Sequence, residues 1–332
     1  MHEFSVLAGQ HIVELLDGRE REVIDWVEAA YLAHDAGSTV NPDSYFLRFP
    51  EKPDARIIAL PAFLGGEDDV AGIKWISSFP ANTESGLPRA SAVLVLNDYR
   101  TGYPFALLES AGISAARTAA SAALAATALG AGSARTVGIV GAGVIARTIA
   151  RYLAAAGIGL TDVVCHDLDD ASAGALAEHL ATRHGSGSRT GSLAEALDCD
   201  LVVLATTALS PYIGTEHTLR AGQVVLNVSL RDIEPELLLT AQNFVDDVDH
   251  CLKANTSPHL AEQRLGDRSF IDGTLADVLR GRVALDPQRP LVFSPFGLGV
   301  LDLAVGHRLF QRARQEGRLT EVPGFFGETR RW

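Results

Sequence analysis

The feature that most constrains the fold of this chain is a strand, a glycine turn and a helix start in immediate succession at residues 136–152, TVGIVGAGVIARTIARY. An apolar run ending at Val140 is typical of a buried strand, and residues 144–153 continue with helical periodicity. Gly141 permits a tight turn, Gly143 lets backbone N–H groups approach a pyrophosphate, and Ala146 allows the helix to pack closely on the strand. The helix N-terminus faces the phosphates with its partial positive charge. The expected cofactor-binding residues of this turn are Gly141, Gly143, Val144 and Ile145.

An acid at the end of the next strand indicates which dinucleotide binds. The apolar run 163–166 ends at Asp167, which lies 26 positions after Gly141. A carboxylate there accepts hydrogen bonds from the ribose 2′-OH and repels a 2′-phosphate, so we expect NAD as the cofactor. Asp169 and Asp170 follow closely, which leaves the identity of the ribose partner open. The pattern also fits an ordinary glycine turn of an α/β protein, with Asp167 as a solvated loop acid.

Composition excludes several classes of partner. The 332 residues are enough for two domains, and a formal net charge of −13 argues against nucleic acid and anionic membranes. No apolar run reaches the length of a membrane span, and the start lacks the basic head of a signal peptide. Three widely spaced cysteines without a CxxC pair are typical of reduced thiols, so we expect a cytoplasmic protein. The ten histidines show no metal-ligand spacing, and we expect no metal.

The first third of the chain lacks the pattern of a dinucleotide fold. Helical periodicity over residues 20–36 is followed by strand-like runs, and the turn at 98–102 predicts a hairpin. The expected strands are 44–49, 56–62, 71–78, 90–97 and 103–108. Several strands after one helix predict an antiparallel or mixed sheet in an α+β domain.

From residue 136 the pattern alternates between strands and helices. We expect strands at 137–140, 162–166, 200–205 and 223–228, helices at 143–156, 171–182 and 193–197, and a loop at 183–192. This alternation predicts an α/β fold with a Rossmann-type doubly wound parallel sheet. An alanine-rich helix at 113–129 connects the two parts, and a long helix at 298–318 is expected to return to the first. The predicted domains are 118–301 for the NAD-binding part, and 1–117 together with 302–332 for the other.

Four basic residues lie in unusually apolar or small-residue surroundings: Arg48, Lys74, Arg89 and Arg117. Alternation along strands allows Arg48 and Lys74 to belong to a solvated polar face. However, Lys74 is flanked by glycine, isoleucine and tryptophan, and lysine in a partly desolvated pocket has a lowered pKa that suits proton transfer. Arginine offers a planar fork for carboxylates, and the small neighbours of Arg117 let a substrate carboxylate or cofactor phosphate approach.

Asp232 follows the strand at 223–228. In open α/β sheets the ligand crevice lies outside the carboxyl ends of the strands, so this position suits a catalytic acid. The alternative is a helix N-cap, because a first turn containing proline follows, and both roles can hold at once.

Further polar and glycine positions follow the later strands. Thr206 and Thr207 come directly after the strand at 200–205 and are expected to contact the dinucleotide, or else to form a simple polar turn. The segment SPFGLG at 294–299 has the composition of another close backbone approach, by the nicotinamide, through Gly297. Ser229, just before Asp232, completes the expected cofactor-binding set.

Taken together, these segments resemble the ornithine cyclodeaminase/mu-crystallin family. The resemblance is carried, in the family's order, by FLRFP with Arg48, GIKWISSFPAN with Lys74, ISAARTAASAA with Arg117, GIVGAGVIA, and NVSLRD with Asp232. It implies a homodimer whose first domain binds substrate and forms the dimer interface. It also implies that the cationic residues hold a substrate carboxylate, while Lys74 and Asp232 act as catalytic residues that handle protons and water.

Within the family, NPDSYFLRFP, GLPRASAVLVLND and SPFGLGVLDLAVG resemble one branch, which makes 2,3-diaminopropionate for siderophores and peptide antibiotics. The resemblance implies an NAD-dependent dehydrogenase that takes hydride from the glutamate α-carbon of N-(2-amino-2-carboxyethyl)-L-glutamate. Water then adds to the imine and releases 2-oxoglutarate and L-2,3-diaminopropionate.

The residues favour this branch on independent grounds. A cyclodeaminase substrate carries one carboxylate and a distal ammonium that needs an acid, and the strand at 56–62 offers none. A tricarboxylate instead needs several cations, and Arg48, Lys74, Arg89 and Arg117 are candidates to bind it. The alternatives are cyclodeamination of ornithine, imine reduction, and a non-enzymatic ligand-binding protein of the mu-crystallin type. Retention of both Lys74 and Asp232 argues against the last.

Overall fold

The computed structural model describes residues 3–327 and divides into two units. The first holds the chain up to Arg117 and again from Leu298, and the second holds Thr118–Gly297. The return to the first unit therefore comes slightly before the predicted boundary at 301/302. The reason is that helix α11, Gly299–Gln315, packs on the first unit from its first turn. No helix within residues 3–327 is long and apolar enough to cross a membrane.

The first unit is a mixed sheet with helices on one face. Its elements are β1 (Ser5–Leu7), α1 (Gly9–Leu16), α2 (Glu20–Asp35), β2 (Thr39–Val40), β3 (Tyr45–Phe49), β4 (Lys52–Leu64), β5 (Val70–Ser78), the 3-10 helix η1 (Pro80–Ser85), β6 (Ala90–Asp98), β7 (Pro104–Glu109), the start of α3 (Ala111–Ala128), α11 and β16 (Thr320–Glu321). The strand order is β16-β1-β7-β6-β5-β4-β2, with β3 paired to β4. All pairs are antiparallel except β1 with β7, so the predicted antiparallel or mixed sheet is confirmed as mixed.

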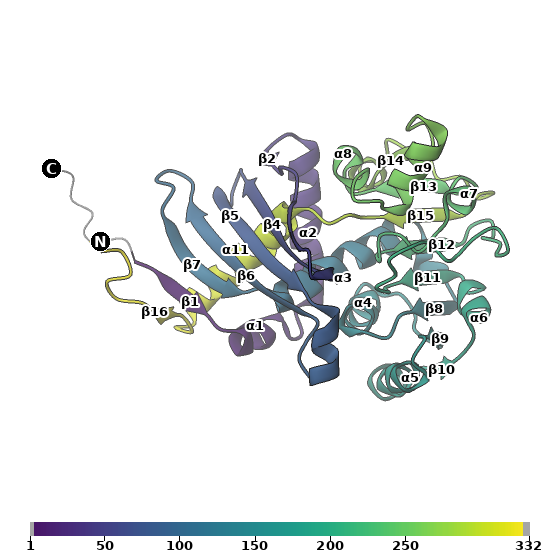
Figure 1. Cartoon of the computed structure of the whole chain (residues 1–332), viewed down its shortest axis with the longest axis horizontal. Helices are drawn as coiled ribbons and strands as arrows, with labels where there is room; N and C mark the ends of the chain where they lie inside the picture. The colour runs from purple at the N-terminus through teal and green to yellow at the C-terminus, as the bar shows by residue number, and fades with distance from the viewer. Residues whose placement is uncertain (1–2, 328–332) are drawn as a thin grey trace. The chain divides into compact units, whose positions relative to one another are not determined.

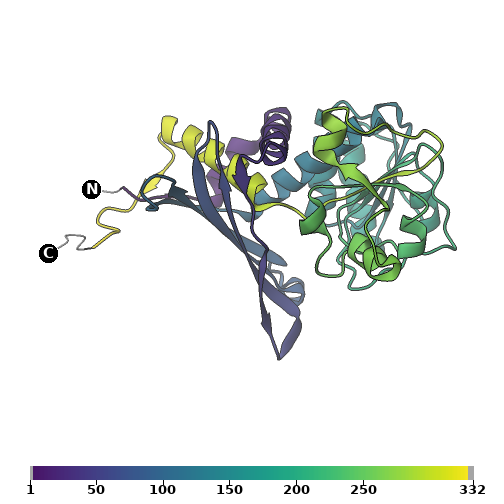
Figure 2. The same cartoon turned by 90° about the horizontal axis from the view of Figure 1, so that it is seen from above.

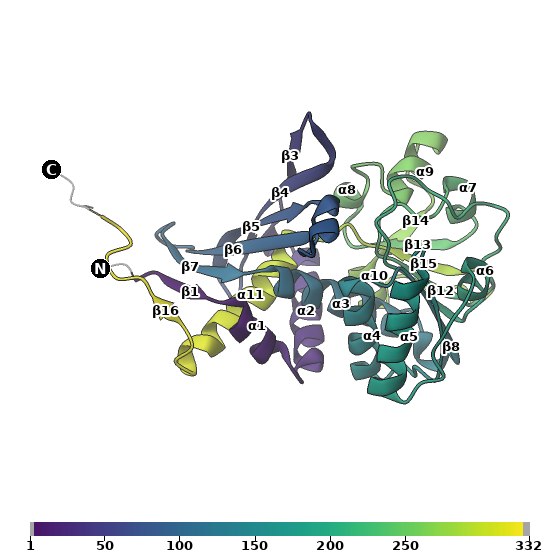
Figure 3. The same ribbon diagram turned by 60° about the horizontal axis from the view of Figure 1, so that its bottom comes forward.

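Period-two alternation divides this sheet into a covered and an open face. Helix α11 packs against β4, β5 and β6, with α2 beside it, and Figure 2 shows both helices on one side of the strands. Val70 and Lys74 of β5 point to the covered face and are buried, whereas Trp75 on the other face is 42% exposed. Figure 3 shows the hairpin of β3 and β4 at one end of the sheet.

The second unit is an eight-stranded parallel sheet, which confirms the doubly wound α/β prediction. Its elements are the end of α3, the 3-10 helix η2 (Ala131–Ser133), β8 (Thr136–Val140), α4 (Val144–Ala155), β9 (Asp162–His166), α5 (Asp170–His184), β10 (Arg189–Thr190), α6 (Leu193–Leu197), β11 (Leu201–Leu204), β12 (Val224–Asn227), α7 (Pro235–Leu238), β13 (Gln242–Val245), α8 (Val248–Cys251), α9 (Ser257–Leu265), β14 (Ile271–Thr274), α10 (Leu275–Leu279) and β15 (Leu291–Ser294). The strand order is β10-β9-β8-β11-β12-β15-β13-β14, and Figure 1 shows the labels stacked in this sequence.

Several short elements were not predicted from the sequence. β10 lies inside the predicted loop 183–192, and β13, β14 and β15 are four-residue strands whose runs are too short to separate from loops by periodicity. β1 and α1 at the start of the chain were also missed. Strands β13 and β15 are buried at every position, so they carry no alternation to detect, whereas the equally buried β11 and β12 were predicted as 200–205 and 223–228.

Candidate active site

Lys74 lies in a buried polar cluster of the first unit. In the sheet register it sits between Leu60 of β4 and Leu94 of β6, and it is only 2% exposed. Its Nζ donates hydrogen bonds to Asp302 Oδ2 at 2.7 Å and to Ser114 Oγ at 3.2 Å. The alternative that Lys74 belongs to a solvated strand face is therefore wrong, because α11 covers that face.

Arg117 joins the same cluster from α3. Its Nε donates to Asp302 Oδ1 at 3.3 Å, and the side chain is 12% exposed. Asp302, in the first turn of α11, is fully buried and shares its two carboxylate oxygens between the two cations. In the part of the chain that the structure describes, Asp302 is the hydrogen-bond partner found for Arg117, and the terminal nitrogens of Arg117 keep their donors available.

The surroundings of Lys74 adjust its proton affinity. Burial disfavours the charged ammonium and lowers the pKa of Lys74 to about 8; the charge of Arg117 acts in the same direction, and Asp302 opposes both. Lys74 therefore changes protonation state in mildly alkaline solution, which suits a group that transfers a proton.

Two further predicted cations lie along the same sheet. The register places Arg48 opposite Arg56 and Arg56 opposite Ser78, and Arg89 Nη1 donates to Ser78 Oγ at 2.7 Å. Ser78 lies four residues after Lys74 along β5, and because side chains alternate between the faces of a strand, the two lie on the same face. Arg48 is exposed, whereas burial lowers the pKa of Arg89. The four predicted substrate-binding cations thus form two groups, with Lys74 and Arg117 in one and Arg48 and Arg89 in the other.

In the second unit, Gly141 is required on two grounds. Its φ is +95°, and a Cβ there would lie 2.5 Å from Ala205 O, which belongs to the loop after β11. That loop is tied to β8, because Ala205 N donates to Val140 O at 2.8 Å. The chain order reverses between β8 and β11, so the turn lies at the topological switch point, where open α/β sheets bind ligands.

Gly143 leaves room for a ligand at the start of α4. It is the N-cap of this helix, but no side chain caps it, and a Cβ added at Gly143 would meet no heavy atom within 4 Å. The first N–H groups of α4, beginning at Val144 and Ile145, therefore face open space at the positive end of the helix dipole. This cradle fits a pyrophosphate.

The hydrogen bonds distinguish among the three acids that follow β9. Asp167 Oδ2 accepts from Ala142 N at 2.7 Å, inside the glycine turn, and its Oδ1 accepts from Asp169 N at 3.0 Å. Asp169 instead caps α5, since its Oδ2 accepts from Ser172 N at 3.1 Å and Ser172 Oγ at 2.6 Å. Asp170 is the first residue of α5 and is exposed. Of the three acids, Asp167 is the one that contacts the turn.

Asp232 is fully buried among hydroxyl groups. Thr206 Oγ1 lies 2.9 Å and 2.8 Å from its two carboxylate oxygens, and Tyr212 Oη donates to Oδ2 at 3.1 Å. Burial raises the pKa of Asp232, although the hydroxyls of Ser229, Thr206 and Tyr212 favour the ionised form. A buried carboxyl with a raised pKa and directional partners is typical of a group that exchanges protons.

The N-cap alternative for Asp232 is wrong. Helix α7 begins at Pro235 and has Glu234 as its N-cap, and the Asp232 side chain points instead to Thr206 and Tyr212. The Asp232 backbone carbonyl accepts from Tyr212 N, which fixes the loop bearing that tyrosine.

The remaining predicted cofactor residues also follow the strands. Ser229 N donates to Leu204 O at 3.0 Å, which sets Ser229 beside the end of β11, and Thr207 is exposed. Gly297 N donates to Asp246 Oδ2 at 2.6 Å. Asp246 is buried at the end of β13, and it holds the backbone of the SPFGLG segment.

These features agree with a match to known proteins. A family model described as the ornithine cyclodeaminase/mu-crystallin family matches residues 5–317. The chain belongs to this family.

Members of the family that resemble the chain include dehydrogenases, reductases and cyclodeaminases. N-((2S)-2-amino-2-carboxyethyl)-L-glutamate dehydrogenase of Staphylococcus aureus is 27% identical over 92% of this chain and 94% of its own length. A Delta(1)-pyrroline-2-carboxylate reductase of Bacillus cereus is 25% identical over 89% and 93%. The structure of the Thermococcus litoralis Delta(1)-pyrroline-2-carboxylate reductase in complex with NADH and L-proline has a TM-score of 0.88 at 26% identity, covering 96% of this chain and all of that one.

Several residues of the site were not predicted from the sequence. Asp302 lies in the apolar run GVLDLAVG, and a single acid among apolar residues was the one sign in the sequence that it is buried and has a partner. The sequence gives no signal for Tyr212 or Asp246, because a tyrosine in a loop and an acid within VDDVDH resemble ordinary surface residues. Their roles come from pairing with residues far along the chain.

Proposed function

We propose that this family member is an NAD-dependent oxidoreductase that converts N-(2-amino-2-carboxyethyl)-L-glutamate and water to 2-oxoglutarate and L-2,3-diaminopropionate. The observation that carries the proposal is that the first unit of a chain with net charge −13 holds two groups of cations, Lys74 with Arg117 and Arg89 with Arg48. Local positive charge in an acidic protein suits a substrate with several carboxylates. The similarity to the Staphylococcus aureus enzyme supports the same substrate.

The carboxyl edge of the second unit supplies the proposed cofactor site. The N–H groups at the start of α4 would hold the pyrophosphate, Asp167 the ribose, and Thr206, Thr207, Ser229 and Gly297 the remainder. Asp167 retains free lone pairs, because a carboxylate has about four acceptor sites and two are used. When bound, NAD supplies a hydride acceptor.

The chain's own residues would manage carboxylates and protons. Arg117 binds a substrate carboxylate, and Lys74 in its neutral form takes the proton that the secondary amine must lose before its α-carbon can give up hydride. Once protonated, Lys74 adds its charge to that of Arg117 in holding the carboxylate. Asp232 then accepts a proton from the water that attacks the imine carbon. Asp232 gives this proton to the nitrogen and then takes the proton of the new hydroxyl group. The carbonyl of 2-oxoglutarate forms as the bond from the former α-carbon to nitrogen breaks, and the nitrogen leaves with the diaminopropionate.

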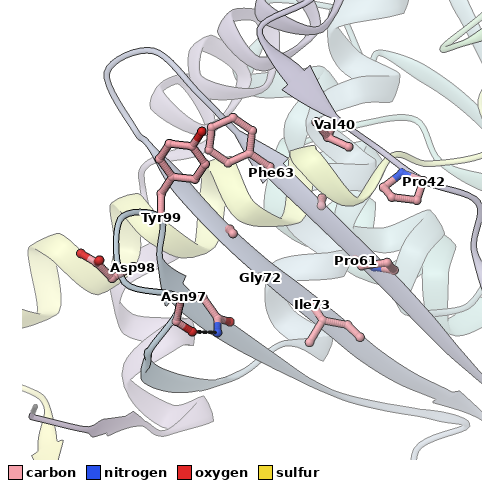
Figure 4. A pocket seen from close by; sticks show the side chains of 12 residues that line it. Val40, Pro42, Pro61, Phe63, Gly72, Ile73, Asn97, Asp98 and Tyr99 are labelled. Atoms are coloured by element: carbon pink, nitrogen blue, oxygen red, sulfur yellow. Dashed lines mark hydrogen bonds between the residues drawn. The ribbon is translucent and has the colours of Figure 1, made fainter.

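We also propose a homodimer formed through the open face of the first unit's sheet. Tyr45, Ala59, Trp75 and Val93 form one register row across four strands, and the three large side chains are exposed. Beside this row is a hollow of about 430 Å³, in which the rings of Phe63 and Tyr99 stack with centroids 4.4 Å apart (Figure 4). A contiguous apolar face of this kind is typical of a subunit interface.

The test mixes purified protein, NAD and the conjugate, and follows the absorbance of the reduced cofactor together with 2-oxoglutarate and diaminopropionate as products. Equal amounts of all three are expected. If the protein instead reduces Delta(1)-pyrroline-2-carboxylate with NADH and leaves the conjugate unchanged, the substrate proposal is wrong. Ammonia release from ornithine without net cofactor change would indicate a cyclodeaminase. NADH binding without turnover of any of these would indicate a ligand-binding protein.

A further inference from the structure

We propose that Asp302 is a positioning residue that joins Lys74 and Arg117 into one carboxylate site with a single net positive charge. This inference rests on the proposed function only for the identity of the bound carboxylate. The joining itself follows from three side chains supplied by three elements: Lys74 by β5, Arg117 by α3 and Asp302 by α11.

The geometry leaves specific donors for a ligand. Lys74 Nζ has three N–H donors, and Asp302 Oδ2 and Ser114 Oγ accept two of them. Arg117 uses Nε for Asp302 Oδ1 and keeps its two terminal nitrogens. One Lys74 donor and the fork of Arg117 therefore remain, and their orientation is fixed because both side chains are tied to the same rigid carboxylate.

The net charge of the cluster formed by Lys74, Arg117 and Asp302 is +1 when Lys74 is protonated. Lys74 and Arg117 contribute two positive charges and Asp302 removes one, so one carboxylate neutralises the site when Lys74 is protonated. Buried charges that lack compensation are costly, so a second carboxylate at this cluster is disfavoured.

Among the residues that the structure describes, Asp302 and Arg117 are the titratable groups that face Lys74 from the elements around it. Its register neighbours are Leu60 and Leu94, α3 contributes Ser114 and Arg117, and the facing residue of α11 is Asp302. Within residues 3–327, the proton affinity of Lys74 is therefore controlled by burial and by two charges of opposite effect. Removal of Asp302 and removal of Arg117 should act on it in opposite directions.

The titration of Lys74 can be measured directly, because the chain contains only three lysines, Lys52, Lys74 and Lys253. The full-length protein, labelled with isotope-enriched lysine, gives three side-chain NMR signals to follow against pH, and Lys74→Arg identifies the signal of Lys74. We expect a Lys74 midpoint near pH 8. Asp302→Asn should lower this midpoint by about 1–3 pH units, and Arg117→Gln should raise it. Lys52 and Lys253 serve as internal controls and should not move.

An unchanged Lys74 midpoint in folded Asp302→Asn would overturn the proposal. If Asp302→Asn does not fold, Arg117→Gln decides, and a midpoint that stays or falls in that variant also overturns it. These titrations need no substrate, so they remain valid if the conjugate proves not to be turned over. Where it is turned over, the limb of the kcat/KM profile that belongs to Lys74 should shift to lower pH in Asp302→Asn, which a purely structural role would not produce.

Discussion

Replacement of Gly143 by alanine separates cofactor binding from folding. Its φ of −77° and ψ of −174° are accessible to alanine, and the added Cβ would meet no protein atom within 4 Å. The variant should therefore stay close to the parent in stability, since alanine restricts the unfolded chain but is a poorer N-cap than glycine. The methyl group would occupy the space in front of the α4 N-terminus that we assign to the pyrophosphate.

The expected loss is one charge-assisted hydrogen bond, about 1.5–3 kcal/mol. Since each tenfold in Kd corresponds to about 1.4 kcal/mol, the Kd for NAD should rise roughly ten- to hundredfold. Titration calorimetry with NAD measures this change, and urea unfolding of the protein without cofactor measures stability.

Gly141→Ala is the matched control, because this substitution should destabilise the fold itself, whereas Gly143→Ala should weaken only cofactor binding. A residue with φ of +95° costs on the order of 1–3 kcal/mol when glycine is replaced, and its Cβ would also lie 2.5 Å from Ala205 O. This variant should lose stability even without cofactor. Unchanged NAD affinity in a folded Gly143→Ala protein would refute the assignment of the phosphate to this helix terminus.

Three further substitutions test other parts of the site. Asp232→Asn should abolish turnover while NADH still binds. Because burial raises the pKa of Asp232, ionisation of this carboxyl group opposes folding at pH values above the ordinary carboxyl pKa. In urea-unfolding measurements the variant should therefore be more stable than the parent at pH 7, and it should lose this advantage below about pH 4. Asp167→Ser should weaken NAD binding and improve NADP binding, so an unaltered ratio of the two Kd values would contradict its role at the ribose. Trp75→Glu, on the open sheet face, should convert dimer to monomer in analytical ultracentrifugation, and a protein that stays dimeric would place the interface elsewhere.

The sequence predicts the cofactor turn and the strands β8, β9, β11 and β12 of the second unit, because their signals are local. The glycine turn and the acid at the end of β9 are read within about one βαβ unit, and each is recognisable from residue types alone. Asp232 was singled out as a candidate because it comes just past a strand, at the end of an open α/β sheet where ligands bind. Its partner Thr206 follows β11, the neighbouring strand, but the hydrogen bond between the two requires the strand order and was not foreseen.

The first unit illustrates what local patterns cannot supply. Alternation along β5 places Lys74 and Trp75 on different faces of the sheet, yet it does not say which of the two faces is covered. The covering element is α11, which begins at Gly299 and brings Asp302 to Lys74 across 228 residues. Likewise, Arg48 and Arg89 read like Lys74 in sequence, but the register places them with Ser78 rather than with Asp302.

The division of the cations bears on substrate choice within the family. If Lys74, Arg117 and Asp302 form a site for one carboxylate, then that site alone satisfies a monocarboxylate such as proline, the ligand of the Thermococcus litoralis reductase. The conjugate proposed here has two more carboxylates, and these must be bound by other cations. Two residues of this sheet can meet that need: Arg89, which is half-buried and anchored on Ser78, and Arg48, which lies in the register row of Ser78. The choice between a tricarboxylate and a monocarboxylate substrate therefore depends on Arg89 and Arg48, while Lys74 and Arg117 serve either substrate equally well.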